Sequence, residues 1–440
     1  MNNNITQNSD PATVISREAH NISLAGISDA AIKVINRLQY ANHEVYLVGG
    51  AVRDLLLGRV PKDFDICTDA LPEEVHSLFR NSRLIGRRFR LVHVRFGREI
   101  IEVATFRGHH DGENNKTEHD AKTLDGMILR DNVFGSLEDD AWRRDFTVNS
   151  LYYNLHDDTV LDYTGGITDL KNNTIRIIGD AELRYQEDPV RMLRVVRFAA
   201  KLGFNIESNT EAPVVNLAER LTAVPPARLF EEVLKLLLSG HAVRSFQLLR
   251  QYGIFKYLFP LTDAYLHDAD SSLTELLING FAHTDHRIEI GKPVTPAYLF
   301  AVLLWKPMWD YAEKLQANGV SPIQSIQLAG TEIISRQCHS VSLPKRFSLQ
   351  TRDIWVMQAK LMSRNGKRAF RTLEHARFCA GYDFLLLRAE SGEKDLAPLC
   401  DWWTDFQETN DAQRATMVQQ VNASNPRRKR PHKRRGPKTP

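Results

Sequence analysis

A chain of 440 residues is too long for one ordinary hydrophobic core, and its length indicates two or three domains. Its composition, 42% hydrophobic and 25% charged, is typical of globular proteins, and its longest apolar run, 297–305, is too short to cross a bilayer. Its four cysteines form no C-x-x-C pair, which argues against a zinc site and against a disulfide framework. We therefore expect a cytoplasmic protein with no membrane span.

The first part of the chain alternates between strand and helix patterns. After a polar leader over 1–24, which we expect to be disordered, hydrophobic periodicity predicts these elements in order: a helix over 30–43, a strand over 45–48, a helix over 51–58, a strand over 62–70, a helix over 72–80, and strands over 91–97 and 99–107. This alternation is typical of an α/β domain.

The second part of the chain is dominated by helix patterns. A polar stretch over 109–125 has no periodicity and predicts a surface loop, and a strand follows over 159–166. From Asp188 to about 419 the apolar residues recur at helical spacing, with Asp188 as the expected N-cap and Pro189 as the first helical residue. The fold class we expect is α+β: an α/β head, an all-helical neck and body, and a C-terminal tail.

Positive charge is concentrated in that tail. The stretch RRKRPHKRRGPK (427–438) holds eight Lys and Arg residues and no acid, so the rest of a chain with net charge +3 carries −5. The sequence predicts a disordered basic tail that contacts a polyanion; a tail that only aids solubility is the alternative. Its candidate contact residues are Arg427, Arg428, Lys429, Arg430, Lys433, Arg434 and Arg435.

Two aspartates alternate in the segment KDFDI. In an extended chain Asp63 and Asp65 project from one face while Phe64 points the other way. Two carboxylates this close repel each other unless a cation lies between them, and Mg²⁺ binds through one or two carboxylates together with substrate phosphates. The alternative is a pair of solvent-facing acids on an edge strand.

A strand that ends in two glycines precedes these aspartates. Gly49 and Gly50 interrupt the apolar strand 45–48 and open a short helix that carries Arg53. Glycines at such a turn let backbone N–H groups approach a phosphate, and Arg53 adds a planar cation; a surface pairing of Arg53 with Asp54 is the alternative. A phosphate-binding turn followed by metal-binding carboxylates indicates two-metal nucleotidyl transfer.

These motifs together resemble a known family. LVGGAVRDLLLG, KDFDI, RRDFTVNSLYY (143–153), EDPVRMLRVVRFAAKLGF (187–204) and PPARLFEEVLKLL (225–237) are similar to the class II tRNA nucleotidyltransferase and poly(A) polymerase family of the polymerase β superfamily. The resemblance covers about 45–260 in register. It implies a catalytic head over 25–180, a neck over 181–260 for base recognition and RNA binding, an RNA-binding body over 261–420 and the tail over 421–440.

The resemblance also implies roles for individual residues. Gly49, Gly50 and Arg53 would hold the triphosphate of ATP, and Asp63 and Asp65 would hold two Mg²⁺ ions. Two acids compete for the place of the third metal carboxylate: Glu102, which we favour, and Asp145, which would then serve nucleotide binding. Arg144 and Asn149, from the motif that contains Asp145, are further nucleotide-binding candidates. The alternatives are that Glu102 pairs with Arg107 and that Asp145 caps a helix.

An arginine stripe lies on the helix that follows Asp188. Arg191, Arg194 and Arg197 recur at intervals of three, and in the family the acid and first arginine of this motif face the base. Asp188 and Arg191 are therefore the base-facing candidates, and Arg194 is a phosphate-binding candidate. The alternative is an exposed face whose arginines pair with neighbouring acids.

The segment LIGRRFRLVHV (84–94) resembles the part of bacterial poly(A) polymerases that distinguishes them from CCA-adding enzymes, and Arg87 and Arg88 are its RNA-binding candidates. With the basic tail, it predicts template-independent addition of AMP from ATP to RNA 3′ ends, in mRNA processing and decay. We expect a monomer, with RNA-decay or RNA-chaperone proteins as candidate partners.

Three alternatives remain open at this point. A CCA-adding enzyme would share the chemistry but use CTP as well as ATP. A non-catalytic RNA-binding protein would not need the aspartates, the glycine turn and the arginine that this chain retains. A metal phosphohydrolase would need a His and Asp ligand set, and neither His267-Asp268 nor 283–286 supplies one.

Overall fold

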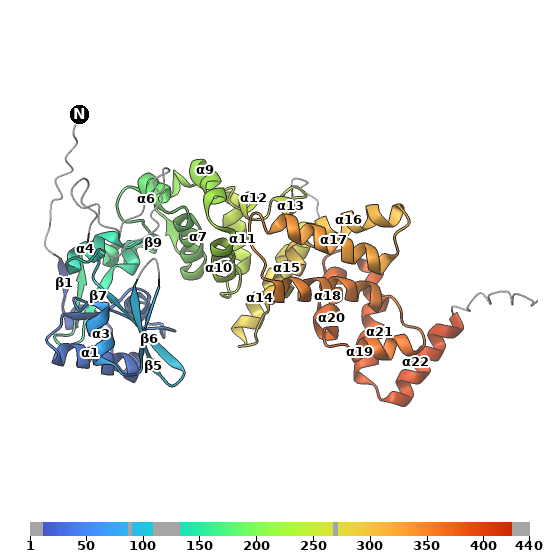
Figure 1. Cartoon of the computed structure of the whole chain (residues 1–440), viewed down its shortest axis with the longest axis horizontal. Helices are drawn as coiled ribbons and strands as arrows, with labels where there is room; N and C mark the ends of the chain where they lie inside the picture. Colours follow the sequence, from blue (N-terminus) through green and yellow to red (C-terminus); the bar gives the residue numbers. More distant parts are fainter. Residues whose placement is uncertain (1–11, 87–89, 109–132, 267–271, 425–440) are drawn as a thin grey trace, which may run out of the picture. The chain divides into compact units, whose positions relative to one another are not determined.

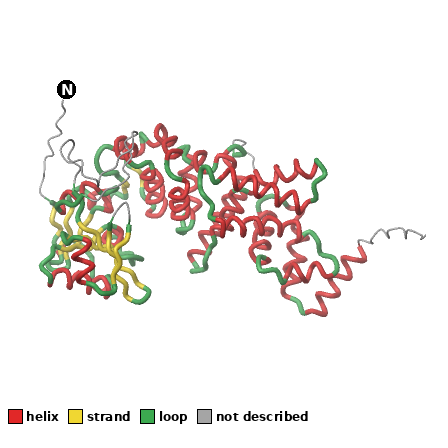
Figure 2. The backbone as a smooth tube through the Cα atoms, in the orientation of Figure 1, coloured by secondary structure: helices red, strands yellow, loops and turns green. Residues whose placement is uncertain are grey.

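The computed structural model describes residues 12–86, 90–108, 133–266 and 272–424 (Figure 1). Contacts within the chain divide it into two compact units, residues 1–224 and 225–440. The first unit contains the sheet, and the described part of the second is built from helices (Figure 2). These features confirm the predicted α+β fold, with a sheet-containing head and a helical body.

The first unit is built on an eight-stranded mixed sheet. From edge to edge its strands are β1 (Thr13–Ile15), β8 (Thr159–Asp162), β7 (Leu151–Asn154), β2 (Val45–Val48), β3 (Asp65–Thr68), β6 (Glu99–Thr105), β5 (Leu91–Phe96) and β4 (Ser82–Ile85). Strands β3 and β6 are parallel, and the other neighbours in the sheet are antiparallel. The all-apolar strand VYLV lies at its centre, since β2 is buried along its whole length.

The helices of the first unit surround this sheet and extend beyond it. They are α1 (Asp29–Tyr40), α2 (Gly50–Leu56), α3 (Pro72–Leu78), α4 (Leu137–Arg143), α5 (Gly166–Lys171), α6 (Ala181–Glu187), α7 (Val190–Leu202), α8 (Ser208–Glu211) and α9 (Val214–Leu217). A small parallel pair, β9 (Thr174–Ile175) with β10 (Asn205–Ile206), lies outside the main sheet. In α1 the buried residues recur at helical spacing and Ser28 caps the first turn, a bond worth about 1 kcal/mol.

The described part of the second unit is helical. Its helices are α10 (Pro226–Leu237), α11 (Ala242–Gln251), α12 (Phe255–Leu258), α13 (Pro260–Asp263), α14 (Ser272–Glu289), α15 (Pro296–Leu303), α16 (Trp305–Ala317), α17 (Pro322–Gln337), α18 (Lys345–Leu361), α19 (Lys367–Leu373), α20 (Phe378–Glu390), α21 (Ala397–Glu408) and α22 (Asp411–Ser424). Short 3₁₀ helices lie at Arg17–Ala19, Leu24–Gly26, Thr147–Asn149, Ala218–Ala223 and Lys394–Leu396.

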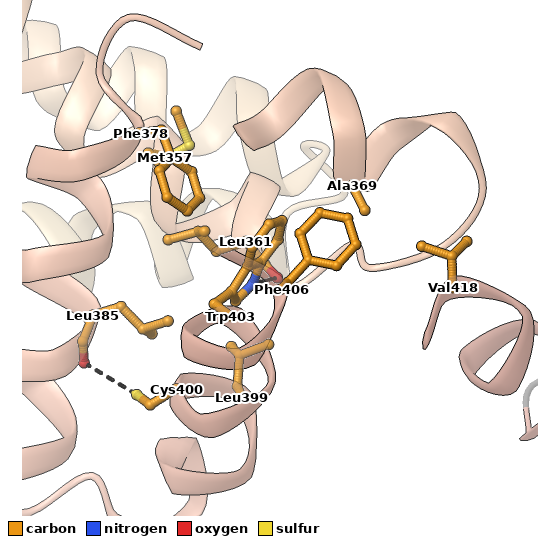
Figure 3. Close-up of a cluster of buried hydrophobic side chains, with 10 residues drawn as sticks. All are labelled: Met357, Leu361, Ala369, Phe378, Leu385, Leu399, Cys400, Trp403, Phe406 and Val418. Atoms are coloured by element: carbon orange, nitrogen blue, oxygen red, sulfur yellow. Dashed lines mark hydrogen bonds between the residues drawn. The ribbon is translucent and has the colours of Figure 1, made fainter. Parts of the chain in front are cut away.

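A hydrophobic cluster joins the last five helices, α18 to α22. Figure 3 shows its members: Met357, Leu361, Ala369, Phe378, Leu385, Leu399, Cys400, Trp403, Phe406 and Val418. Trp403 is fully buried, and its Nε1 donates a hydrogen bond to the carbonyl oxygen of Leu361 at 2.9 Å. The indole N–H is therefore satisfied, and the end of α18 is fixed against α21.

Several predicted boundaries differ from the structure. The disordered leader over 1–24 is wrong at Thr13–Ile15, which forms β1 and pairs with β8. A three-residue strand is too short for a periodic signal, and its stability comes from a partner about 150 residues away in sequence. Helix α7 begins at Val190, after Pro189, while Oδ1 of Asp188 still accepts the N–H of Val190 at 3.3 Å.

Other predictions fall outside the described residues. These are the whole predicted loop over 109–125 and the RNA-binding candidates Arg87, Arg88, Arg427, Arg428, Lys429, Arg430, Lys433, Arg434 and Arg435. In the part of the chain that the structure describes, no helix has both the length and the apolar character needed to cross a membrane. The predicted division of the chain at 180, 260 and 420 stays a prediction.

Candidate functional site

The glycine turn lies beside the acidic segment. Gly49 follows the last residue of β2, has φ +76°, and donates its N–H to the carbonyl oxygen of Leu151 at 3.3 Å. The positive φ favours glycine at this position, and Nη1 of Arg144 lies 3.6 Å from where a Cβ on Gly49 would stand, which is ordinary contact distance. Because Val48 pairs with Asp65 across β2 and β3, the turn and this carboxylate emerge at the same end of the sheet.

Arg53 is buried at this turn. Its side chain is 2% exposed, and its Nε and Nη2 donate to Oδ1 of Asp54 at 2.8 and 2.7 Å. Nη1 donates to Oδ1 of Asn149 at 2.5 Å, and the guanidinium carbon lies 5.4 Å from the ring centroid of Phe198 on α7. The pairing of Arg53 with Asp54 that the sequence left open does occur, but in the interior of the head.

Asn149 continues this chain of contacts to Asp145. Its Nδ2 donates to Oδ1 of Asp145 at 3.5 Å, and Oδ2 of Asp145 forms a 2.6 Å ion pair with Arg194 on α7. Burial opposes the charge of the Asp145 carboxylate, but Arg194 and then Arg191 outweigh it and lower its pKa. We call Asp54, Arg53, Asn149, Asp145 and Arg194 the buried relay; it joins α2, the RRDFTVN motif and α7.

A second polar group holds Arg144. Its Nε donates to Oδ2 of Asp140 at 3.0 Å and lies 2.9 Å from the hydroxyl of Tyr152, which itself donates to Oδ2 of Asp140 at 2.8 Å. The guanidinium also lies over the Tyr152 ring, 5.2 Å from its centroid. Arg144 is thereby fixed with one nitrogen toward the Gly49 turn.

Three carboxylates form a separate group, which we call the acidic triad: Asp63, Asp65 and Glu102. Asp63 and Asp65 are exposed and Phe64 between them is buried, as the alternation predicted. Strand β3 begins at Asp65, so Asp63 lies just before it. Asp65 is paired in register with Glu102 on the parallel strand β6, which brings the third acid beside the first two.

Glu102 has its own partner on the next strand. Nε2 of His93 on β5 lies 3.0 Å from Oε1 of Glu102, and the two residues are directly opposite each other in the antiparallel register. The Glu102 side chain remains 49% exposed. The predicted alternative of a Glu102–Arg107 pair is thus replaced by a His93 pair.

Within the described residues, Asp63 and Asp65 form no ion pair, whereas Glu102 is paired with His93. Desolvation, and then the negative charge of Glu102, raise the pKa of Asp65 to about 6; Asp63 adds to this rise and Arg144 opposes it. A cation bound beside Asp65 would stabilise the charged form of its carboxylate, which the protein disfavours. Asp145 is not among the charged groups that shift the pKa of Asp65; its carboxylate is paired with Arg194 in the buried relay.

The base-facing candidates lie at the start of α7. Nη1 of Arg191 donates to the carbonyl oxygen of Arg184 at 2.8 Å and to Oε2 of Glu187 at 3.0 Å. Within the described residues, Nε of Arg194 is buried and has no hydrogen-bond partner. A guanidinium carries five N–H donors, so Arg191 and Arg194 can each donate to a ligand as well as to the protein.

Sequence reasoning missed several residues of this region. Asp140 and Tyr152 hold Arg144, and His93 holds Glu102. Arg184, whose pKa is lowered to about 10 by burial and by Arg191, donates from Nη2 to the carbonyl oxygens of Arg143 and Arg144 at 2.7 and 2.6 Å. Tyr152 lies in the motif RRDFTVNSLYY, which the sequence analysis had singled out. The other contacts join segments that no local pattern in the sequence connects.

Comparison with known proteins identifies the family of the chain. Three family models match: Poly A polymerase head domain over 45–176, Probable RNA and SrmB- binding site of polymerase A over 203–266, and Polymerase A arginine-rich C-terminus over 318–437. Poly(A) polymerase I of Salmonella typhimurium is 48% identical over 428 residues, which cover 96% of this chain and 92% of that protein. The chain belongs to the poly(A) polymerase I family. This confirms the resemblance seen in the sequence and places the chain among nucleotidyltransferase enzymes.

CCA-adding enzymes resemble the chain less completely than poly(A) polymerase I does. The CCA-adding enzyme of Leuconostoc mesenteroides is 40% identical over 225 residues, 51% of this chain and 53% of that protein. The crystal structure of the Bacillus stearothermophilus CCA-adding enzyme in complex with CTP superposes with a TM-score of 0.55 and 26% identity, over 90% of this chain and 82% of that one. The poly(A) polymerase I family thus shares its fold with CCA-adding enzymes, while the close similarity extends over about half of the chain.

Divalent metal use is general among nucleotidyltransferases, and the acidic triad fits it. Its oxygen ligands suit a hard cation, and its repulsion raises the pKa of Asp65. Within the described residues, no group of three or more His, Cys, Asp or Glu side chains is arranged to hold a metal ion on its own. A cation at Asp63 and Asp65 would therefore take its remaining ligands from triphosphate oxygens and water, as Mg²⁺ commonly does.

Proposed function

We propose that the protein transfers AMP from ATP to the 3′-hydroxyl of RNA without a template and releases pyrophosphate. One observation carries the proposal: the acidic triad lies at the same end of the sheet as the Gly49 turn, through the register pairs of Val48 with Asp65 and Asp65 with Glu102. Similarity to a poly(A) polymerase I over 96% of the chain supports adenylate as the transferred group.

The proposed reaction forms a bond from the RNA 3′-oxygen to the α-phosphorus of ATP and breaks the bond from that phosphorus to the bridging oxygen of pyrophosphate. Two divalent cations, held by Asp63 and Asp65 with Glu102 as the third carboxylate, would supply Lewis acidity at the attacking and leaving oxygens. Helix α2 begins directly after Gly49, and the N–H groups of the first turn of a helix have no acceptor within that helix. These N–H groups can donate to the triphosphate. Arg144, fixed by Asp140 and Tyr152, places positive charge beside this turn.

Asp145 receives a different role from Glu102. Its carboxylate is 9% exposed and already paired with Arg194 and Asn149, so it offers little to a metal ion. We assign it to positioning: it holds Arg194 and, through Asn149, Arg53 beside the nucleotide. Arg53, Asn149 and Arg194 are then the nucleotide-positioning side chains of the buried relay.

Selection of ATP is assigned to the start of α7. Arg191 supplies N–H donors and the Asp188 carboxylate supplies acceptors, which are the two kinds of group that a base edge requires. A site built for the hydrogen bonds of adenine leaves its own groups unpaired with another base, which disfavours that base. We further propose that the enzyme acts on many RNA 3′ ends in mRNA processing and decay, in the cytoplasm.

The alternative product is a CCA end on tRNA, and similarity to CCA-adding enzymes over half of the chain keeps it testable. The test incubates the protein with a short RNA and with each nucleoside triphosphate separately, in Mg²⁺. Long extension with ATP alone is expected. Required incorporation of CTP, on tRNA only, would contradict polyadenylation and favour CCA addition.

A further inference from the structure

A basic hollow lies in the second unit, far in sequence from the residues assigned to catalysis. It has a volume of about 730 Å³ and is formed where the turn between α18 and α19 meets the end of α22. Its lining includes Arg364, Asn365, Lys367, Arg368, Val421 and Asn422.

The charge of this hollow has one sign. Three of its lining residues are cationic and none is acidic. Among the described residues, no carboxylate lies within 4.0 Å of the charged nitrogens of Arg364, Lys367 or Arg368. On α22 itself, by contrast, Arg414 pairs with Asp411 at 3.0 Å. Three neighbouring cations that the protein leaves unpaired are complementary to a polyanion.

The cluster of Figure 3 fixes the walls of the hollow. Leu361 at the end of α18, Ala369 on α19 and Val418 on α22 all belong to it. Arg364 therefore lies in the turn after α18, and Lys367 and Arg368 lie on α19, while the apolar sides of α18, α19 and α22 share one core. The backbone that carries the three cations is held in place by this core.

An aromatic contact orients one of the three cations. The Arg364 guanidinium carbon lies 5.6 Å from the Trp402 ring centroid, and Trp402 stacks on Phe406 at 4.6 Å. Arg364 is thus held by a ring rather than by a carboxylate, which leaves its N–H donors available to phosphate oxygens.

We propose that this hollow binds backbone phosphates of single-stranded RNA. The inference rests on the proposed function, since it takes RNA as the polyanion. Arginine and lysine contact phosphates without reading the base, which suits an enzyme that extends many different 3′ ends. The next basic residues along the chain begin at Arg427, five residues after Asn422 and so within about 18 Å of it even when fully extended. Positive charge thus continues along the chain from the hollow.

The test measures RNA binding by the full chain at several salt concentrations. One variant carries Arg364→Gln, Lys367→Gln and Arg368→Gln, and the probe is a fluorescently labelled single-stranded RNA. Each phosphate contact on a single strand contributes about 0.7 to the slope of log K against log salt, so the slope should fall by about 2. A charge-preserving variant, with Arg364→Lys, Lys367→Arg and Arg368→Lys, should keep most of the slope.

A matched control removes the same charge elsewhere in the second unit. Lys292, Lys314 and Lys394 are exposed and form no ion pair among the described residues. Their combined replacement by Gln should leave the slope near that of the unaltered protein. An unchanged slope in the Arg364, Lys367 and Arg368 variant, or an equal fall in both variants, would overturn the proposal.

Two further measurements distinguish RNA from small phosphates as the ligand of the hollow, and distinguish this proposal from the proposed function. Pyrophosphate, added at constant ionic strength, should not displace the RNA; displacement would assign the hollow to small phosphates and overturn RNA as its ligand. An unaltered protein that binds RNA with the full slope but adds no AMP would contradict the proposed function and still support the hollow as an RNA site.

Discussion

Two groups of charged side chains in the head are built in opposite ways. In the buried relay each carboxylate has a cationic partner: Asp54 binds Arg53, and Asp145 binds Arg194. In the acidic triad Asp63 and Asp65 have no cationic partner within the described residues, and desolvation together with Glu102 raises the pKa of Asp65 to about 6.

The difference separates positioning from chemistry. Buried charges that satisfy each other define a shape, and removal of one partner leaves the other uncompensated. Carboxylates that repel each other reduce the stability of the folded protein, and a bound cation relieves that repulsion. On this account the relay sets where the nucleotide lies, and the triad binds the metal ions that act on it. The predictions below test this division.

The largest effect is expected for Asp65→Asn. The rate of AMP incorporation should fall about a thousand-fold, because a metal ligand that supplies several kcal/mol of charge stabilisation is lost. As a control, Glu99→Gln removes an exposed charge at the start of β6, three residues from Glu102 and therefore on the opposite face of the strand, and should leave the rate unchanged. Equal rates for Asp65→Asn and the unaltered protein would show that the triad is not catalytic.

The same substitution should raise stability in metal-free buffer. The pKa of Asp65 in the folded protein, about 6, lies above the 3.8 of an ordinary aspartate, so the charged carboxylate disfavours folding and stability falls as pH rises from about 4 to about 6. The gain in Tm for Asp65→Asn should therefore be present above pH about 6 and absent below about 4. Thermal unfolding at both pH values checks this, and a loss of Tm at the higher pH would contradict the sign.

Substitution of Arg53 should lower the stability of the protein instead of raising it. Arg53→Met leaves Asp54 and Asn149 without their partner in the interior, so the free energy of unfolding should fall by about 3 kcal/mol. Arg53→Lys should recover little of this, because an ammonium cannot reach Asp54 and Asn149 with the fork geometry of a guanidinium. Denaturant unfolding of both variants measures the effect; full stability in Arg53→Met would remove the relay from the account.

Glu102 and Asp145 can be separated by measuring rate and stability together. Glu102→Gln should reduce the rate about a hundred-fold and raise the Mg²⁺ concentration that it requires, with little change in Tm, since its side chain is half exposed. Asp145→Asn should lower Tm, because the ion pair between the buried Asp145 carboxylate and Arg194 is lost. If Asp145→Asn instead changes the Mg²⁺ requirement and Glu102→Gln does not, Asp145 is the third metal carboxylate.

The smallest effect is expected at His93. His93→Phe removes the hydrogen bond that orients Glu102, and loss of such an outer partner typically costs about ten-fold in metal affinity. His93→Gln can still donate to Oε1 of Glu102 and should recover part of the affinity. Direct titration with Mn²⁺ provides the readout. A Mn²⁺ affinity of His93→Phe equal to that of the unaltered protein would mean that His93 has no part in positioning Glu102.

The sequence predicted those parts of the site that depend on local order. The strand 45–48, the glycine turn and the facing of Asp63 and Asp65 follow from period-two alternation and from glycine at a strand end. The partners of these residues could not be read in this way. Arg53 meets Asn149 across 96 positions, and His93 meets Glu102 only because β5 and β6 pair in one register. The strand β1 was missed for the same reason, since its pairing with β8 is entirely non-local.

Cation binding to the acidic triad tests the central claim most directly. The measurement is binding of Mn²⁺ to metal-free protein in the presence of a non-hydrolysable ATP analogue, followed by electron paramagnetic resonance. Binding is predicted at neutral pH, weakened at pH about 5 where protons compete for Asp65, and lost in Asp65→Asn but not in Glu99→Gln. Equal Mn²⁺ binding by the unaltered protein and by Asp65→Asn would contradict the account.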